Sequence, residues 1–166
     1  MEFSRIIEKQ KEVIDAVRER NYGTAHEVES WQELENLTFA FHSELMELAN
    51  EVAFFKHWKQ GHEIKRERVL EELVDCFAFL FHISIMKNYV PMVMQAKAEE
   101  FYVENLDLMS LFTAIRKSDL STSSEVSVVL NLLLVISAKL GFSEETLENA
   151  YISKSDKNIK RQKEGY

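Results

Sequence analysis

Residues 41–60 read FHSELMELANEVAFFKHWKQ, a run of good helix formers with no Gly or Pro before Gly61. Apolar side chains recur in it at the spacing of one helical face. Glu44, Glu47 and Glu51 follow at i, i+3 and i+7, so these carboxylates lie along or beside the apolar stripe. A carboxylate is costly to bury unless its charge is compensated. The stretch therefore predicts a packed helix whose acidic side chains need a positively charged partner.

A second acidic step lies in the most apolar helix expected from the sequence, residues 69–88. Glu72 and Asp75 form an E-x-x-D step there, and Glu44 and Glu47 form an E-x-x-E step in the first stretch. Residues three apart are neighbours on one helix face. If the two helices pack together, four carboxylates converge in a mostly apolar setting, where a divalent cation offsets their repulsion. Oxygen ligands without thiolate or imidazole favour Mg²⁺ or Mn²⁺.

The composition favours a single all-α domain over residues 1–166. The chain has 166 residues, of which only 4 are Gly and 1 is Pro, and 46% of its residues are hydrophobic. Ser30 and Glu33 form a capping-box pattern, with Ser30 as the N-cap. Helices are expected over residues 2–20, 30–60, 69–88, 98–118, 125–140 and 144–153. A polar, basic tail is expected from about residue 153 to residue 166.

Charge and cysteine content narrow the classes of function. With 28 acidic and 20 basic residues, the formal net charge is −8, which argues against a nucleic-acid partner. The single cysteine, Cys76, cannot form an internal disulfide and favours a reducing compartment. The first ten residues are charged and do not resemble a signal peptide, and no run of 18 apolar residues predicts a membrane span. A cytoplasmic protein without a membrane partner is expected.

Two other metal chemistries do not fit the sequence. A ferritin-like di-iron site uses Glu-x-x-His steps, and none of the five histidines has an acidic residue three positions before it. A zinc hydrolase of the His-x-x-x-His type is also not supported, because no two histidines are four apart and only one cysteine is present. The histidines are expected to be structural or surface groups.

In three blocks the sequence resembles the dimeric, all-α dUTP pyrophosphatases, which belong to the MazG-like superfamily of nucleoside triphosphate pyrophosphohydrolases. The blocks are FAFHSELMELANEVAFFKHWK, LEELVDCFAFLFHISI and AYISKSDKNIKRQKEGY. The E-x-x-E and E-x-x-D pair alone indicates the superfamily. The A-N-E and F-K-x-W-K extensions of the first block and the ending N-x-x-R-Q-x-x-G-Y indicate the dUTPase branch.

The resemblance implies hydrolysis of dUTP to dUMP and pyrophosphate by a metal-activated water, with Mg²⁺ as the cofactor and Mn²⁺ as a substitute. Carried over by position, the metal ligands are Glu44, Glu47, Glu72 and Asp75. One of the Glu44/Glu47 pair, Glu47 before Glu44, would also orient or deprotonate the attacking water. Eight residues are implied to contact the substrate: Gln10, Lys56, Trp58, Lys59, Lys154, Asn158, Arg161 and Tyr166.

The implied substrate contacts fall into three groups. Gln10 resembles a glutamine that reads uracil, and Trp58 is the best stacking candidate in the F-K-x-W-K segment. The C-terminal residues belong to a tail that closes over base, sugar and phosphates. Two positions depart from the family pattern: Ser155 stands where the tail usually has Asn, and Ala78 where members often have His.

The sequence also bears on assembly and leaves alternatives open. Residues 69–88 and 125–140 are apolar nearly all round, which favours a homodimer that covers them, although full burial inside one chain would serve as well. One alternative to dUTP hydrolysis is the same chemistry on another nucleotide, such as dCTP. The other is a non-catalytic, metal-binding helical interaction protein.

Overall fold

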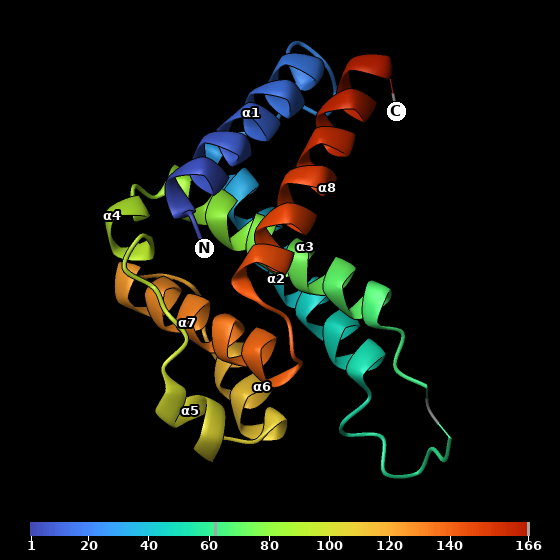
Figure 1. Ribbon diagram of the computed structural model, residues 1–166. Coiled ribbons are helices and arrows are strands. Elements are labelled where there is room, and N and C mark those ends of the chain that lie inside the picture. Colours follow the sequence, from blue (N-terminus) through green and yellow to red (C-terminus); the bar gives the residue numbers. More distant parts are fainter. Residues whose placement is uncertain (62, 166) are drawn as a thin grey trace.

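The computed structural model describes residues 1–61 and 63–165, and every regular element within these residues is a helix (Figure 1). The expected all-α fold class is therefore confirmed. Helices follow in the order α1 (Phe3–Asn21), α2 (Ser30–Val52), α3 (Arg66–Met86), α4 (Val90–Val93), α5 (Glu100–Asn105), α6 (Leu108–Arg116), α7 (Ser123–Lys139) and α8 (Glu144–Glu164).

Helix α3 is the centre of the fold. It packs antiparallel against α2, and it also contacts α1, α7 and α8 (Figure 1). Leu73, Leu80 and Ile83 are fully buried on it. A helix that is apolar on most sides needs such neighbours, because each uncovered side would leave apolar surface in water.

Helices α1 and α8 run side by side in the same direction and form a second pair above α2 and α3 (Figure 1). Charged groups join the two helices along their length. Arg5 Nη1 lies 3.1 Å from Glu148 Oε1, and Lys9 Nζ lies 3.1 Å from Asp156 Oδ1. Nearer the chain end, Arg20 donates to Gln162 over 3.0 Å. The C-terminal half of α8 is thus docked on α1.

The ends of several helices differ from the sequence predictions. Helix α2 ends at Val52, not near residue 60, because Ala53 takes a left-handed conformation with φ 55° and its N–H bonds the Ala49 carbonyl over 2.8 Å. Phe54 then packs on Phe112 of α6, with ring centroids 4.9 Å apart. This tertiary contact outweighs the good helix propensity of residues 53–60.

The predicted capping box at Ser30 is wrong. The N-cap of α2 is Glu29, and Ser30 is the first helical residue. Glu33, which was expected to reach back to Ser30, instead accepts from Arg18 and contacts His82. A charged partner for the carboxylate offers a stronger hydrogen bond than the backbone N–H of the cap.

Two further boundaries were predicted incorrectly. Residues 98–118 form two helices, because Asp107 accepts from Ser110 N over 2.7 Å and so caps a new helix, α6. The last helix continues to Glu164 instead of ending at residue 153. The sequence predicts a tail here because the docking of these basic residues on α1 cannot be read from charge alone.

The chain itself covers most of the apolar surface of α3 and α7, so burial of these two helices does not require a partner. Three exposed apolar side chains lie on the outer face of α2 (Trp31, Phe39 and Met46), and α7 has one, Val128, which is 52% exposed. Among the described residues, no single helix is long and apolar enough to cross a membrane. Helices α7 and α8 pass that test only as a pair, across a 110° bend and by length and composition alone.

The capping box at the start of α7 gives a stability prediction. Thr122 accepts from Glu125 N over 3.2 Å, and Glu125 accepts from Thr122 N over 3.0 Å. We expect Thr122→Ala to lower the free energy of unfolding by about 1 kcal/mol, measured by urea denaturation. Ser124→Ala, at an exposed position two residues on, is the control and should change stability by less than about 0.5 kcal/mol. Equal losses in both variants would contradict the capping role.

Candidate active site

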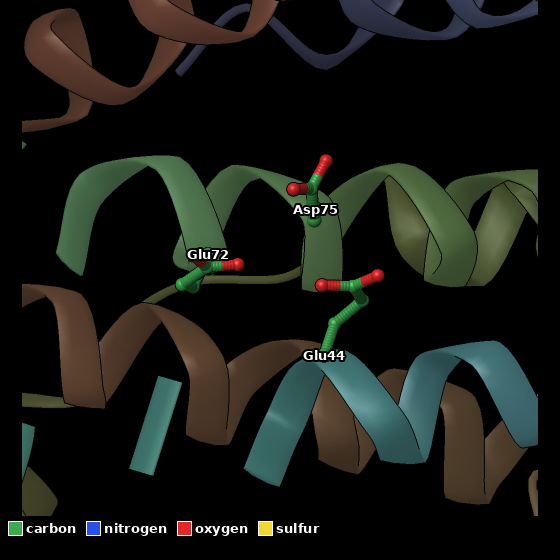
Figure 2. Close-up of side chains that lie close together, drawn as sticks. All are labelled: Glu44, Glu72 and Asp75. Atoms are coloured by element: carbon green, nitrogen blue, oxygen red, sulfur yellow. The ribbon is translucent and has the colours of Figure 1, made fainter. Parts of the chain in front are cut away.

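Three carboxylates converge where α2 faces α3. Glu44 projects from α2 toward α3, which carries Glu72 and Asp75 (Figure 2). One carboxylate oxygen from each residue lies within 4.8 Å of the others. The antiparallel packing of the two helices thus places the E-x-x-D step opposite Glu44, at separations that a single cation can bridge.

Burial and mutual repulsion make the ionised form of these carboxylates costly. Burial, together with the charges of Asp75, Glu47 and Glu72, raises the pKa of Glu44 to about 7. Burial also raises the pKa of Glu72, which is only 4% exposed, and that of Asp75. A nearby positive charge would favour the ionised form of all three.

Two basic side chains border the cluster. Lys154, from α8, forms an ion pair with the Asp75 carboxylate, and its Nζ lies 3.8 Å from Glu71 Oε1. Arg68, one turn before Glu72 on α3, donates to Glu72 Oε1 over 3.0 Å. The cluster therefore lies between positive groups from two helices.

The side chains of the cluster suit a hard divalent cation. All three candidate ligands are carboxylates, as Mg²⁺ and Mn²⁺ prefer. Cys76 follows Asp75 but is completely buried, and burial raises the pKa of its thiol well above the usual range. A protonated, buried thiol is no ligand for a soft metal. The donor set thus fits the metal class expected from the sequence.

Glu47, the fourth predicted ligand, lies outside this group of three. It is exposed on α2, although its charge contributes to the raised pKa of Glu44, Glu72 and Asp75. Its side chain lines a wide hollow of about 980 Å³ along the outer face of α2. Glu47 is therefore open to solvent beside the cluster.

The structure brings three of the predicted C-terminal contacts together. Lys154, Asn158 and Arg161 line one cleft of about 350 Å³ between α8 and α3, opposite Glu67 and Glu71. Their spacing of four and three residues places them on one face of α8. Tyr166 lies outside the described residues.

The F-K-x-W-K residues lie in the turns that follow α2. Lys56 donates to the Asn50 carbonyl over 3.2 Å, and its Nζ lies 5.6 Å from the centroid of the Phe55 ring. Trp58 is 66% exposed. Lys59 lines a separate surface cleft, which also includes Arg68. These residues do not line the cleft that contains Lys154.

Gln10 lies on α1, where this helix packs on α8, and is only 4% exposed. Its side-chain carbonyl accepts a hydrogen bond from the Tyr151 hydroxyl. Burial raises the pKa of Tyr151, whose side chain also interacts with Ser155. Ser155, which stands where the resemblance expects Asn, is itself buried beside Tyr151.

Sequence reasoning missed a cavity of about 550 Å³ between the C-terminal end of α1, the N-terminal part of α2 and the second half of α3. Ala40 and Phe79 line it, each four residues from a carboxylate of the cluster. Four residues of helix correspond to about 6 Å, so the cavity begins roughly one turn from Glu44 and Asp75. Ala40 and Phe79 lie four residues from Glu44 and Asp75, so the sequence would have indicated this cavity if the pairing of α2 with α3 had been known.

The far side of this cavity holds a polar group of three residues from three helices. Arg18 of α1 donates to Glu33 Oε2 over 3.0 Å, and His82 Nε2 of α3 lies 3.1 Å from Glu33 Oε1. Burial lowers the pKa of His82 despite the Glu33 charge, which favours a neutral ring. Asn36 also lines the cavity and adds an amide to its wall.

An all-α fold with a carboxylate cluster flanked by basic side chains fits the class of metal-dependent hydrolases that act on anionic substrates. The chain belongs to the dUTPase family, because the family model for dUTPase matches residues 2–166. Membership implies hydrolysis of the pyrophosphate linkage of dUTP or dUDP, and metal dependence is general in this family. The resemblance drawn from the three sequence blocks is therefore confirmed. The comparison with curated proteins gave no match.

The raised pKa of Glu44 gives a pH prediction for the metal-free protein. A carboxyl group whose pKa is higher in the folded state stabilises the fold below its unfolded pKa, and this stability is lost as the pH rises through the folded value. With a chelator present, we expect the free energy of unfolding of the wild type to fall on the order of 1 kcal/mol relative to that of Glu44→Gln between pH 5 and pH 8. The fall is smaller than the full pKa shift would give, because Glu44 is partly exposed and solvent screens its charge.

Thermal unfolding of both proteins at several pH values measures this difference. Added Mg²⁺ should remove it, because a bound cation stabilises the ionised carboxylate. Stability curves that stay parallel from pH 5 to pH 8 would show that Glu44 is not perturbed as described.

Proposed function

We propose that the chain hydrolyses dUTP to dUMP and pyrophosphate in a Mg²⁺-dependent reaction at the cluster of Glu44, Glu72 and Asp75. The observation that carries the proposal is the meeting of these three carboxylates within 4.8 Å in a chain of the dUTPase family. Mn²⁺ would substitute for Mg²⁺, because it accepts the same hard oxygen ligands.

A bound Mg²⁺ would supply Lewis-acid chemistry, polarising phosphate oxygens and lowering the pKa of water. Glu44, Glu72 and Asp75 would hold the ion. Glu47 would orient the attacking water or accept its proton, with Glu44 as the alternative. Exposure of Glu47 beside the cluster supports this role, since a general base must be within reach of water.

The basic residues around the cluster would bind the phosphates. Lys154 and Arg161 would contribute charge from the α3–α8 cleft, and Asn158 would add hydrogen bonds. Lys56 and Lys59 would approach from the turns after α2. The family's closing tail corresponds here to the C-terminal half of α8 and the residues that follow it, so we also propose Tyr166 as a contact.

The uracil base would occupy the 550 Å³ cavity, which begins one turn from Glu44 and Asp75. This volume is within the usual range for small-molecule pockets. Phe79 offers a ring face to the base, and the Asn36 amide can donate to a carbonyl and accept from N3–H. Gln10 is buried and does not line this cavity. It stays a proposed uracil contact through its amide nitrogen, because its carbonyl oxygen already accepts from Tyr151. Trp58 remains a proposed stacking contact from the turns after α2.

A homodimer would form through the outer face of α2. Trp31, Phe39 and Met46 are 63%, 80% and 37% exposed there, and all three line the hollow of about 980 Å³. Exposed apolar side chains gathered on one face of a packed helix favour contact with a self-complementary surface, as in a two-fold dimer. Glu47 lines the same hollow, so the partner would lie close to the site.

The first experiment measures hydrolysis of dUTP, dUDP, dCTP and dTTP with Mg²⁺, by chromatography of the nucleotide products and a pyrophosphate assay. Asp75→Asn should lower kcat for dUTP by at least about 100-fold. Replacing a residue that only hydrogen-bonds to a metal ligand lowers activity by up to about 100-fold, and replacing a ligand should cost at least as much. Asp15→Asn, on the exposed face of α1, is the matched control and should retain activity. Preference for dCTP over dUTP would contradict the substrate, and full activity of Asp75→Asn would contradict the site.

The base cavity gives a separate prediction. Asn36→Ala should raise KM for dUTP about fivefold with little change in kcat, since one hydrogen bond to the substrate is worth roughly 1 kcal/mol. Gln32→Ala, exposed on the same helix, is the control and should leave both constants unchanged. A fall in kcat at constant KM would place Asn36 near the reacting phosphates instead of the base.

A further inference from the structure

The carboxylate cluster already has a cation beside it, supplied by the protein. The Lys154 ammonium is ion-paired with the Asp75 carboxylate, and the two side chains are 24% and 22% exposed. The same ammonium donates to the Glu71 carbonyl over 3.5 Å. Its charge also lowers the pKa of Glu44, Glu72 and Asp75, against the effect of burial. Lys154 thus offsets part of the charge of all three candidate ligands.

A divalent cation and this ammonium cannot both hold Asp75 without strong repulsion. Two like charges at contact distance repel strongly at the effective dielectric of a partly buried site. Asp75 must also offer its oxygens to the metal. Lys154 is paired with only one Asp75 oxygen, Oδ2, but a metal ion at the cluster would place more positive charge beside the same carboxylate. Metal binding therefore competes with the Lys154 ammonium and favours its release from Asp75.

The structure provides a place for the displaced side chain. Lys154 already lines the cleft of about 350 Å³ between α3 and α8, together with Asn158 and Arg161. A lysine has a flexible four-carbon stem, so its ammonium can swing from Asp75 into this cleft while α8 stays docked. The backbone of α8 is held on α1 by separate ion pairs, among them Lys9 with Asp156.

We propose that Lys154 is the resident counter-ion of the carboxylate cluster and that a divalent cation displaces it into the α3–α8 cleft. The displaced ammonium then becomes available to an anionic phosphate. Metal and nucleotide binding are thereby coupled through one side chain, and the coupling must be reciprocal. The inference rests on the proposed metal site, but it concerns binding to the protein before any nucleotide is present.

The test is Mn²⁺ binding without nucleotide, followed by the electron paramagnetic resonance signal of free Mn²⁺ at constant pH. Lys154→Met should bind Mn²⁺ at least about fivefold more tightly than the wild type, the lower end of typical coupling between two sites. Lys157→Met is the matched control, because it removes the same charge from the same cleft. Its affinity should change less than about twofold, since exposed charges are strongly screened.

Two results would overturn the proposal: unchanged or weaker Mn²⁺ binding by Lys154→Met, or an equal gain in Lys157→Met, which would show a general charge effect. No Mn²⁺ binding by wild type and Lys154→Met alike would also overturn it. Lys154→Gln should shift affinity in the same direction as Lys154→Met and replaces it if that variant does not fold.

A second measurement follows thermal unfolding. In a chelator, Lys154→Met should melt below the wild type, because the carboxylates lose their counter-ion, and Mn²⁺ should raise its Tm by more than it raises that of the wild type. Equal Mn²⁺ shifts in the two proteins would contradict displacement. Neither measurement involves dUTP, so loss of the proposed hydrolysis with unchanged Mn²⁺ results would refute the function and leave this inference standing.

Discussion

The antiparallel packing of α2 on α3 is the constraint on which the rest of the structure depends. Fully buried side chains such as Phe41, Leu45, Leu73 and Leu80 hold this pair together. The same packing holds Glu44 opposite Glu72 and Asp75, in surroundings where ionised carboxylates are costly. A cluster that could hold a cation thus results from the way in which the core is packed, and rigid helices fix its geometry better than loops would.

Buried apolar contacts with α3 position helices α1 and α8, and ion pairs bring their charged side chains together. Helix α8 brings Lys154 to Asp75, and α1 holds α8 in place through ion pairs along its length. Exposed ion pairs contribute little each, so the buried apolar contacts of α1 and α8 with α3 supply most of the attachment. The basic face of α8 can therefore line a cleft beside the acidic cluster although the whole chain carries a net charge of −8.

The surroundings of the cluster are divided among three regions that differ in chemistry. Charged side chains of both signs line the α3–α8 cleft, Phe79 and Asn36 line the cavity, and the outer face of α2 has exposed apolar side chains. Each region borders the cluster: Lys154 of the cleft pairs with Asp75, Phe79 of the cavity lies one turn after Asp75, and Glu47 of the outer face lies one turn after Glu44. In the proposed function, the cleft would take the triphosphate, the cavity the base and the outer face of α2 a second copy of the chain, because these three occupants place different demands on a surface.

The sequence by itself determined the all-α class, the family and the two acidic steps, because helical periodicity and motif spacing are local properties of the chain. It could not place Glu47 outside the group of three, nor the Lys154 ammonium on Asp75, because both depend on how α2, α3 and α8 pack. The end of α2 at Val52 and the helical continuation of α8 to Glu164 were likewise decided by tertiary contacts, of Phe54 with Phe112 and of α8 with α1. Local propensity is worth tenths of a kcal/mol per residue, and packing of apolar and charged side chains outweighs it where the two differ.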